Sequence, residues 1–472
     1  MHIVMFSINP LFPDHVMGGA PKHLQEIALH LGRRGHDVTV LCTKSNQDVD
    51  AFHWHPRVQV RPILGFKQPF PQPYAIPAYE LANVVSDVAA SLKEADRFYM
   101  HDGEFLFPYV YRDIPTVVSL RDNLYPETIL GGYLFAAHRL ILISEYSRQY
   151  YRSTVGRFFP EFDQRTQVIY NGIDWEKFSR VPTDDIREFL GLESGLESVE
   201  RPIVLHPHRP EPSKGLMETI AVADLLVHQY GFSDLLVLAP KWHDVQASSD
   251  LRAYYDSVTA EVCNRKLEDH FRFHDWIPQD LMPQYYSLGT VTLSLGSFPE
   301  SFGNAVYESL GCGTLSVAAR ISTHRELVPD ELLEKVDYGD IVGAAALAAT
   351  IISNRQRTSA KLLDYLQQRY SLQTQMNTYE TAILNAQIAE PMAYRAEAHE
   401  GRQKYKLAHW CYLSEQRGIY HDFRADYLTE ESIIRLIKSH PAGFTLEEAS
   451  RHGVDQKRVE RLQYEGYLAP LQ

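Results

Sequence analysis

The feature of this sequence that most limits its fold is an alternation of short apolar runs with amphipathic helical patterns. Residues 3–8 read as a buried strand, residues 24–31 follow helical spacing, and residues 38–42 read as a second strand. A strand, a helix and a strand in this order form a βαβ unit, in which the two strands lie parallel. The start of the chain therefore predicts a parallel sheet covered by helices.

The alternation runs through the first third of the chain, stops, and then starts again. Further strands are expected at residues 58–62, 97–100, 116–120, 140–143 and 167–170, with helices at 78–92 and 145–156. After a break at 171–174, strands are expected at 203–206, 235–239, 271–273, 291–295 and 315–318, with helices at 216–228 and 304–311. A chain of 472 residues is too long for one core. We therefore predict two doubly wound, Rossmann-like α/β domains, at residues 1–175 and 200–370.

The last hundred residues depart from this alternation. We expect a helix at 371–390 that returns towards the N-terminal domain, a helical linker at 391–425, and a C-terminal helical, winged-helix-like module at 426–472. Within this module, three short helical patterns are followed by a strand pattern at 467–470. Its eight acidic and six basic residues give a net charge of −2, which favours docking to a protein over binding DNA.

Bulk properties exclude several classes of protein. The formal net charge of −14 argues against broad nucleic-acid binding. No apolar run approaches the ~20 residues that span a bilayer, and residues 1–10 lack the basic start of a signal peptide. The four cysteines are scattered without disulfide-like spacing, which indicates free thiols and a cytoplasmic location.

The closest histidine pairs invite a metal hypothesis. These pairs are His53 with His55 and His206 with His208, and neither has a third ligand nearby in the sequence. We interpret them as partly exposed side chains at strand ends and loops, and we expect no metal site.

Two sets of residues lie where strands of the predicted sheets end. Gly18 and Gly19 separate the first strand from the first helix, where glycines let the backbone approach an anion. Arg209 and Lys214 follow the first strand of the second domain, at the sheet edge where such folds bind ligands. Two cations in that position suit a diphosphate.

The most specific segment, residues 297–308, follows the strand at 291–295. Glu300 lies in its loop, Gly303 and Asn304 open a helix, and Glu308 lies about one turn inside that helix. The first N–H groups of a helix can bind phosphate, while one carboxylate holds sugar hydroxyls and the other ribose hydroxyls.

This segment resembles the donor-site signature of the family-four retaining glycosyltransferases, which have the GT-B fold of two Rossmann-like domains facing across a cleft. Further similar segments, in the same order as in the family, are 18–20 with 35–40, 144–147, 168–174, 276–278 and Glu326 within 325–328. The resemblance covers roughly residues 1–387 and not the C-terminal module.

The resemblance implies a role for each matching residue. Arg209 and Lys214 would neutralise the donor diphosphate as it leaves, and Glu300 would contact the transferred sugar. The implied donor-binding residues are Gly18, Gly19, Ile277 beside the base, Ser301, Phe302, Gly303, Asn304 and Glu308 on the ribose. The chemistry then requires neither a metal nor a further cofactor, since preorganised donors stabilise the leaving diphosphate.

One departure from the family pattern concerns the strand at 116–120. The family has a His-Asp pair after this strand, whereas this chain has Arg121 and Asp122. Arg121 could replace the histidine if Asp122 pairs with it, or it could bind an acidic acceptor. His101, followed by Asp102, lies one strand earlier and is the other candidate for the missing imidazole.

We therefore predict a glycosyltransferase, with hexose the expected sugar, that moves a sugar from a nucleoside-diphosphate sugar to an acceptor hydroxyl with retention. Acceptor loops are expected at residues 68–77 and 123–133, and the C-terminal module could bind a protein partner. The alternatives are a nucleotide-sugar epimerase of the same fold and a nucleotide-sugar-binding docking protein without catalysis.

Overall fold

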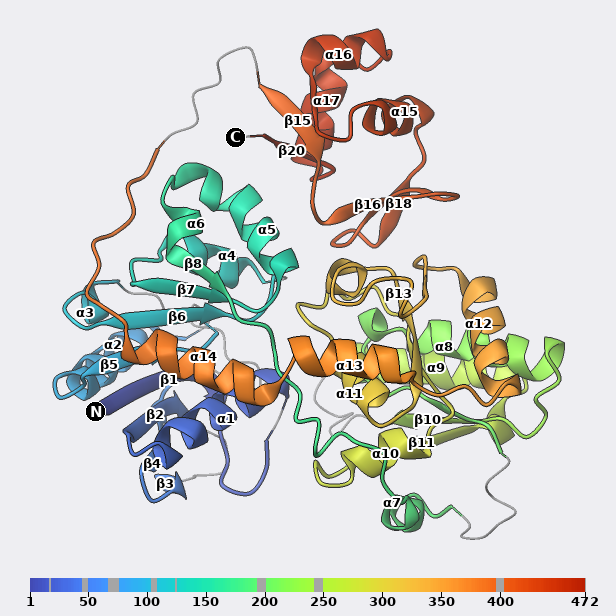
Figure 1. The fold of residues 1–472 in the computed structure, drawn as a ribbon, viewed down its shortest axis with the longest axis horizontal. Helices are drawn as coiled ribbons and strands as arrows, with labels where there is room; N and C mark the ends of the chain where they lie inside the picture. The colour runs from blue at the N-terminus through green and yellow to red at the C-terminus, as the bar shows by residue number, and fades with distance from the viewer. Residues whose placement is uncertain are drawn as a thin grey trace. The chain divides into compact units, whose positions relative to one another are not determined.

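The computed structural model describes residues 1–16, 18–44, 50–66, 76–102, 108–123, 125–192, 201–241, 249–395 and 403–471. Most of the expected acceptor loop at 68–77 lies outside these residues. The chain divides into two compact units. Unit 1 comprises Met1–Asn171, Gln373–His421 and Asp426–Gln472, and unit 2 comprises Gly172–Leu372 and Asp422–Ala425. Figure 1 gives the labels of their elements.

In unit 1 the described residues form an eight-stranded sheet in the order β3-β4-β2-β1-β5-β6-β7-β8. Its strands are β1 (His2–Pro10), β2 (Asp37–Thr43), β3 (Phe52–His55), β4 (Val58–Leu64), β5 (Arg97–Met100), β6 (Thr116–Leu120), β7 (Arg139–Leu142) and β8 (Thr166–Val168). All neighbours are parallel except β3 on β4. Strand order reverses at β1, which pairs with both β2 and β5. The carboxyl ends of strands at such a reversal are where open α/β sheets bind ligands.

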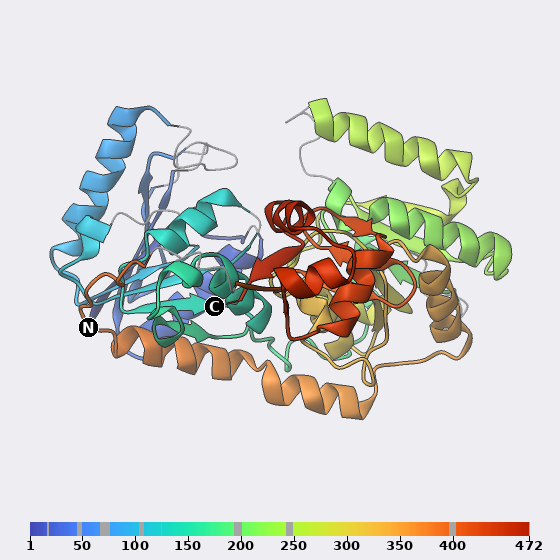
Figure 2. The same cartoon turned by 90° about the horizontal axis from the view of Figure 1, so that it is seen from above.

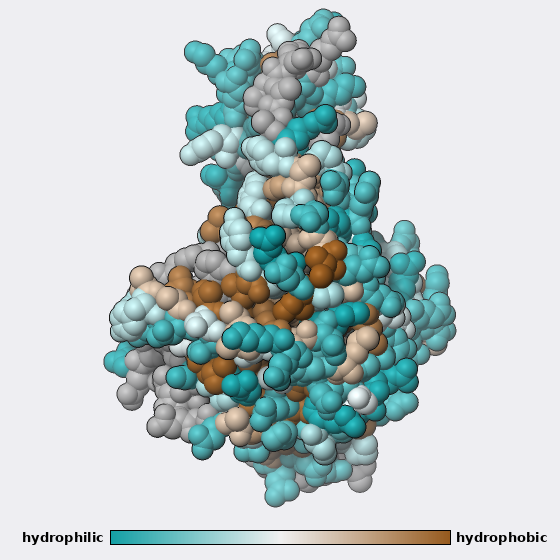
Figure 3. Space-filling model, turned by 90° about the vertical axis from the view of Figure 1, so that its left-hand side faces the viewer, coloured by the Kyte–Doolittle hydropathy of each residue, from teal (hydrophilic) through white to brown (hydrophobic). Residues whose placement is uncertain are grey.

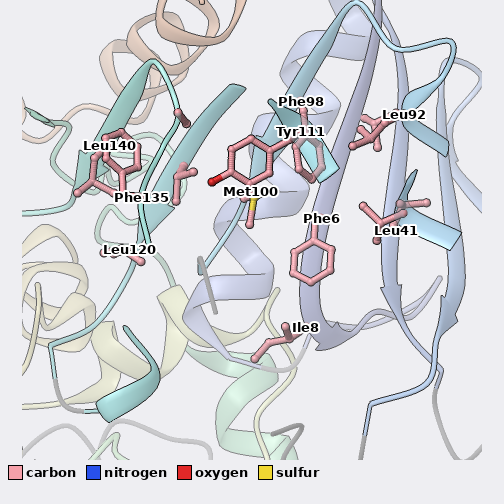
Figure 4. Close-up of a cluster of buried hydrophobic side chains, with 14 of the residues drawn as sticks. Phe6, Ile8, Leu41, Leu92, Phe98, Met100, Tyr111, Leu120, Phe135 and Leu140 are labelled. Carbon is pink, nitrogen blue, oxygen red and sulfur yellow. The ribbon is translucent and has the colours of Figure 1, made fainter. Parts of the chain in front are cut away.

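The core of this sheet is a cluster of apolar side chains (Figure 4). Phe6 of β1, Met100 of β5 and Leu120 of β6 are all fully or almost fully buried. The helices of this region are α1 (Gly19–Arg33), α2 (Ala78–Leu92), α3 (Pro108–Tyr111), α4 (Pro126–Tyr133), α5 (Glu145–Thr154) and α6 (Phe162–Arg165). Burial on both faces explains why the strands read as continuous apolar runs.

Helix α14 (Leu372–Leu384) completes unit 1 although it follows unit 2 in the sequence (Figures 1 and 2). Its Tyr379 ring is fully buried and lies 5.9 Å from the ring of Tyr99. Its Glu380 carboxylate accepts a hydrogen bond from Arg34 of the α1 end, and Arg97 donates to the Leu384 carbonyl. The helix therefore supplies both core and polar contacts to the N-terminal sheet.

Unit 2 contains, within its described part, a six-stranded parallel sheet in the order β11-β10-β9-β12-β13-β14. The strands are β9 (Ile203–Leu205), β10 (Leu236–Pro240), β11 (Phe271–His274), β12 (Val291–Ser294), β13 (Leu315–Ala319) and β14 (Lys335–Val336). Its helices are α7 (Asp184–Phe189), α8 (Leu216–Asp224), α9 (Ser249–Asn264), α10 (Met282–Leu288), α11 (Asn304–Gly311), α12 (Ile341–Ser353) and α13 (Ala360–Arg369). Strand order reverses between β9 and β12.

The C-terminal segment mixes helices with two small antiparallel sheets, in the orders β19-β15-β20 and β16-β17-β18. Its elements are β15 (Lys404–Leu407), β16 (Cys411–Ser414), β17 (Gly418–His421), β18 (Asp426–Leu428), α15 (Glu431–Ser439), β19 (Phe444–Thr445), α16 (Leu446–Arg451), α17 (Gln456–Tyr464) and β20 (Leu468–Pro470). The three helices and β20 confirm the patterns predicted for 429–470.

The helical linker predicted at 391–425 is wrong in the part that the structure describes. Strands β15, β16 and β17 occupy this range. Each has only four residues, which is too short for the spacing of apolar residues to separate a strand from a helix. Pairing with a distant partner decides the conformation instead, since β15 pairs with β20.

Figure 3 shows one face of the molecule, on which hydrophilic side chains dominate and apolar ones form scattered patches. Among the helices described, none combines the length and apolar character that crossing a membrane requires. The four cysteines are free, as predicted, with Cys263 exposed and Cys42, Cys312 and Cys411 buried.

Candidate functional site

The candidate site in unit 2 lies at the carboxyl ends of β9 and β12, where the strand order reverses. The loops that follow these two strands touch through glycines. Gly215 has φ +85°, and a Cβ atom there would lie 2.4 Å from the backbone nitrogen of Gly296. The Phe298 N–H donates to the Ser213 carbonyl at 3.0 Å. Only glycine at position 215 lets the two loops come this close. The contacts on either side of Lys214, at Ser213 and Gly215, fix the position of Lys214.

Lys214 and Glu300 form an ion pair at the meeting point of these loops. Lys214 Nζ donates to Glu300 Oε1 at 2.6 Å and lies 3.5 Å from the centre of the Phe298 ring. The Lys214 side chain is 10% exposed and that of Glu300 is 23% exposed. The ammonium is thus held by a carboxylate and by an aromatic face at a partly open sheet edge.

The charges of this site control the ionisation of Glu300. Burial alone would raise the pKa of its carboxyl, but the Lys214 ammonium and its hydrogen bond outweigh burial, with smaller contributions from His324 and Arg209. The pKa of Glu300 is therefore below its ordinary value, and the carboxylate is ionised at neutral pH.

A third loop, after β13, closes the site. Thr323 Oγ1 donates to the Glu300 carbonyl at 3.0 Å. His324 lies against Gly303, where an added Cβ would be 2.4 Å from His324 Cε1. Gly303 has φ +84° and immediately precedes α11. The loop therefore packs His324 onto the start of α11.

These three loops enclose a small recess with a cavity of ≈ 10 Å³. It is lined by His208, Ser213, Lys214, Ser294, Gly296, Phe298, Glu300, Ile321 and His324. The recess thus combines the two sequence-predicted residues Lys214 and Glu300 with two imidazoles that sequence reasoning missed.

Both imidazoles are neutral at neutral pH. Burial lowers the pKa of His208 to about 3, helped by Lys214, and burial lowers the pKa of His324 to about 4 against the opposing effect of Glu300. Within the described part of the protein, the Nε2 atom of each has no hydrogen-bond partner. Buried polar atoms are nearly always paired, so these atoms are suited to contact a bound ligand. The only sequence signal was that His208 precedes Arg209 in the same loop.

His206, by contrast, corrects an expectation. The sequence suggested a partly exposed side chain, but His206 is fully buried and its Nδ1 shares a hydrogen bond with Thr219 Oγ1 at 3.0 Å. The difference arises because His206 immediately follows β9, a central strand that helices cover.

The remaining predicted residues of unit 2 are not in the described lining of the recess. Arg209 is 44% exposed and pairs with Glu211 at 3.3 Å. Ile277 is buried in the turn after β11, and Glu308 is buried on α11, where Tyr286 donates to Glu308 Oε2 at 3.2 Å. Ser301 and Phe302 are buried just before Gly303, and Asn304 begins α11.

In unit 1, Gly18, His101 and Gly19 lie at the strand-order reversal. Gly18 has φ +96° and precedes α1, which begins at Gly19. The buried His101 ring is occupied on both sides, since Tyr99 donates to Nδ1 at 2.8 Å and Nε2 donates to the Ala20 carbonyl at 2.9 Å. Burial holds the pKa of His101 well below its ordinary value. Its predicted catalytic role stays a prediction.

Arg121 is also buried in unit 1. Its guanidinium donates to the Tyr379 hydroxyl at 3.0 Å and to Asn171 Oδ1 at 2.7 Å. Two of its N–H groups are thus paired, one with Tyr379 of α14 and one with Asn171. This arrangement places a fixed positive charge beyond the end of β6.

Sequence reasoning named Asp102 only as the residue that follows His101. The backbone of Asp102 has φ +71°, and its carboxyl group is buried. The Oδ2 atom accepts a hydrogen bond from Asn9 at 2.9 Å. Burial raises its pKa to about 7, although Arg121 opposes the change. A strained backbone and a displaced pKa at a ligand-binding sheet edge are typical of functional positions.

The sequence comparison concerns the N-terminal part of the chain. Residues 17–177 match the sequence profile of Glycosyltransferase Family 4.

This part of the chain belongs to glycosyltransferase family 4. The curated protein "Putative glycosyltransferase YtcC" of Bacillus subtilis (strain 168) is 23% identical over 224 residues, which cover 46% of this chain. The alignment spans about half (52%) of the length of that relative.

Solved structures are similar to this chain in fold. Sucrose-phosphate synthase (tll1590) from Thermosynechococcus elongatus matches 80% of this chain and 97% of its own, with a TM-score of 0.64 and 18% identity. Anabaena Alr3699/HepE in complex with UDP and glucose matches 81% and 98%, with a TM-score of 0.60 and 22% identity. The predicted family and the two Rossmann-like sheets of the GT-B fold are confirmed.

A much larger cavity lies in unit 1. Its volume is ≈ 620 Å³, and its lining includes the aromatic rings of Tyr133, Tyr150, Trp410 and Tyr464. Its described lining contains none of the predicted catalytic or donor-binding residues, although Ile129 and Tyr133 belong to the acceptor loop expected at 123–133. The paired cation and carboxylate are in the smaller recess. Nor do the described residues contain a group of three His, Cys, Asp or Glu side chains arranged to hold a metal ion.

Proposed function

We propose that the chain is a glycosyltransferase that moves a sugar, with hexose the expected case, from a nucleoside-diphosphate sugar to an acceptor hydroxyl. The observation that carries this proposal is the recess at the β9–β12 reversal. Its lining includes Lys214, Glu300 and two imidazoles whose Nε2 atoms have no partner among the described residues. Family 4 membership supplies the reaction class, and retention of configuration is the stereochemistry that the family implies.

In the proposed reaction the bond between the anomeric carbon and the diphosphate oxygen breaks. A new bond forms between that carbon and the acceptor oxygen, whose proton passes to the leaving diphosphate. Negative charge builds on the leaving diphosphate, so fixed cations and N–H donors stabilise the transition state more than the ground state. Lys214 and Arg209 are assigned this role, with the N–H groups of the first turn of α11.

The two carboxylates receive separate roles. Glu300 is ionised beside Lys214 and would accept hydrogen bonds from the hydroxyls of the transferred sugar. Glu308 is held by the Tyr286 hydroxyl and would accept hydrogen bonds from the ribose. Ile277, buried in the turn after β11, would contact the base. The proposal thus gives each part of the donor its own contact residue.

UDP is the first nucleotide to test, because the HepE structure was determined with UDP and glucose. Thermal unfolding of the full chain should be measured with UDP, GDP and ADP. A nucleotide at 100 to 1,000 times its Kd should stabilise the protein by about 3–4 kcal/mol. Lys214→Ala and Glu308→Gln should both reduce this shift, while Lys361→Ala, a surface change on α13, should preserve it.

Two outcomes would redirect the proposal. If the folded wild-type protein is stabilised by none of the nucleotides, the chain is a docking protein on this fold rather than a transferase. If nucleotide is released from the sugar donor equally with and without acceptors, and the sugar is recovered epimerised, the epimerase alternative is correct. Acceptor-dependent release of nucleotide supports transfer.

A further inference from the structure

The C-terminal segment contributes one carboxylate to unit 2, and this carboxylate holds the loop that carries His324. We propose that Asp422 is a positioning residue for the donor site: it fixes the loop at 322–325 so that the His324 imidazole stays in the recess. This inference rests on the proposed function of that recess as the donor site.

Asp422 makes three hydrogen bonds to this loop. Its Oδ1 accepts from the Ser322 N–H at 3.2 Å and from Arg325 Nη1 at 2.7 Å, and its Oδ2 accepts from Arg325 Nη2 at 2.8 Å. The two bonds to Arg325 form a bidentate pair, the most directional arrangement of these two groups. The Asp422 side chain is fully buried and that of Arg325 is 12% exposed. A buried pair of this kind holds the loop in one position, because neither the carboxylate nor the guanidinium can pair with water instead.

The two residues between these anchors face the donor site. Thr323 donates to the Glu300 carbonyl, and His324 lines the recess with Lys214 and Glu300. His324 is 1% exposed, and its Nδ1 shares a hydrogen bond with the Tyr307 hydroxyl at 3.2 Å. This bond engages Nδ1, while Nε2 has no partner in the described part of the chain. Asp422 therefore anchors both ends of a segment whose middle touches the site.

The backbone of the loop needs this anchor. Ser322 has φ +40°, in the left-handed region that residues other than glycine rarely adopt. Such a conformation persists only where the surroundings over-determine it. The Ser322 N–H bonded to Asp422 is one such constraint, and without it the loop can relax to an ordinary conformation that withdraws His324.

Asp422 comes from outside the two large sheets. It lies 97 positions after Arg325, in the turn that joins β17 to β18. The donor site of this chain thus depends on a residue that the doubly wound domains do not contain. A function in donor binding is thereby assigned to part of the C-terminal segment.

The test is a double-mutant cycle in the full chain, with the Kd of UDP, GDP and ADP measured by titration calorimetry. The variants are Asp422→Ala, His324→Ala and the double variant. Each single change should weaken binding of the accepted nucleotide at least tenfold. In the His324→Ala background, Asp422→Ala should cause less than a threefold further loss, because Asp422 acts through His324. Asp422→Asn, which keeps the acceptor for Ser322 but not the charge, should fall between wild type and Asp422→Ala.

The control is Asp224→Asn, which removes another aspartate–arginine pair of unit 2, the 2.7 Å contact with Arg265. It should leave the Kd unchanged although it lowers thermal stability. If Asp422→Ala remains folded by circular dichroism and binds nucleotide as tightly as wild type, the positioning role is refuted. Equal losses in both His324 backgrounds would also refute it, since they would indicate a general structural effect. Absence of nucleotide binding in the wild type would instead overturn the proposed function itself.

Discussion

Lys214 and Glu300 are 86 residues apart in the sequence, yet Lys214 Nζ lies 2.6 Å from Glu300 Oε1. The pair joins the loop after β9 to the loop after β12, on either side of the strand-order reversal. Under the proposed function a donor diphosphate competes with Glu300 for the same ammonium. Binding of the donor would therefore free the Glu300 carboxylate for the sugar hydroxyls.

The first prediction concerns the ionisation of Glu300. In Lys214→Met the main opposing charge is gone, so burial should raise the pKa of Glu300 above the ordinary glutamate value of about 4.3. Carbon-13 NMR titration of labelled glutamate carboxyl groups measures this directly. Lys361→Met, on the surface of α13, should leave the Glu300 titration in place. A Glu300 pKa that stays low in Lys214→Met would show that the ion pair does not control it.

A second prediction tests the close approach of the two loops. Gly231 has φ +77° with open space around it, so Gly231→Ala should cost only the backbone term of about 1 kcal/mol. Gly215→Ala adds a clash with the backbone of Gly296 and should cost about 2–4 kcal/mol in total. Urea unfolding of both variants measures the difference. Equal costs would mean that the loops are not in contact.

A third prediction concerns the ribose. Removing one hydrogen bond to a charged group costs about 1.5–3 kcal/mol, so wild-type protein should bind UDP at least tenfold more tightly than 2′-deoxy-UDP. Glu308→Gln should reduce this preference most, and Tyr286→Phe, which only releases the Glu308 side chain, should reduce it less. Calorimetric titration with both nucleotides provides the comparison. If Glu308→Gln keeps the full preference, the ribose is bound elsewhere.

A fourth prediction follows from the raised pKa of Asp102. Its folded-state pKa is about 7, against about 4 in an unfolded chain. As the pH rises from 4 to 7 the unfolded state loses this proton first, so the carboxyl group progressively destabilises unit 1. Asp102→Asn should therefore be more stable than wild type at pH 8, by about 2–4 kcal/mol, and no more stable at pH 4.

Hydrogen exchange of the β5 and β6 amides at the two pH values is the measurement for Asp102, because it reports on unit 1 alone. Asparagine tolerates a positive φ, so the substitution preserves the backbone. Asp113→Asn, on an exposed side chain, should show no such pH-dependent gain. The same gain in both variants would trace the effect to net charge rather than to burial.

The large sheets could be predicted because buried parallel strands are continuous apolar runs. Strands β5 and β6 and helix α11 have the predicted bounds. Strand β3 was missed because its four residues, Phe-His-Trp-His, are too few for their alternation of apolar and titratable side chains to identify a strand. In the C-terminal segment, four-residue strands such as β15 owe their conformation to partners that local sequence does not reveal.

The candidate site was predictable only where its residues follow strand ends. Lys214 and Glu300 were both identified, because each lies in a loop at the carboxyl edge of a strand. Their contact with His324 was not, because it depends on how the loop after β13 packs on Gly303. Asp422 carried no local signal, since its role comes from Arg325, 97 positions earlier.

Helix α14 has a consequence for how the protein is made. Its Tyr379 hydroxyl accepts a hydrogen bond from Arg121, and its ring is buried against Tyr99, yet 201 residues of unit 2 separate it from Asn171. Ribosomes add roughly 5–20 residues per second, so the N-terminal sheet waits about 10–40 s for its last helix. During synthesis the nascent sheet exposes the surface that α14 later covers. A chaperone that shields this surface would act in the interval between synthesis of the N-terminal sheet and synthesis of α14.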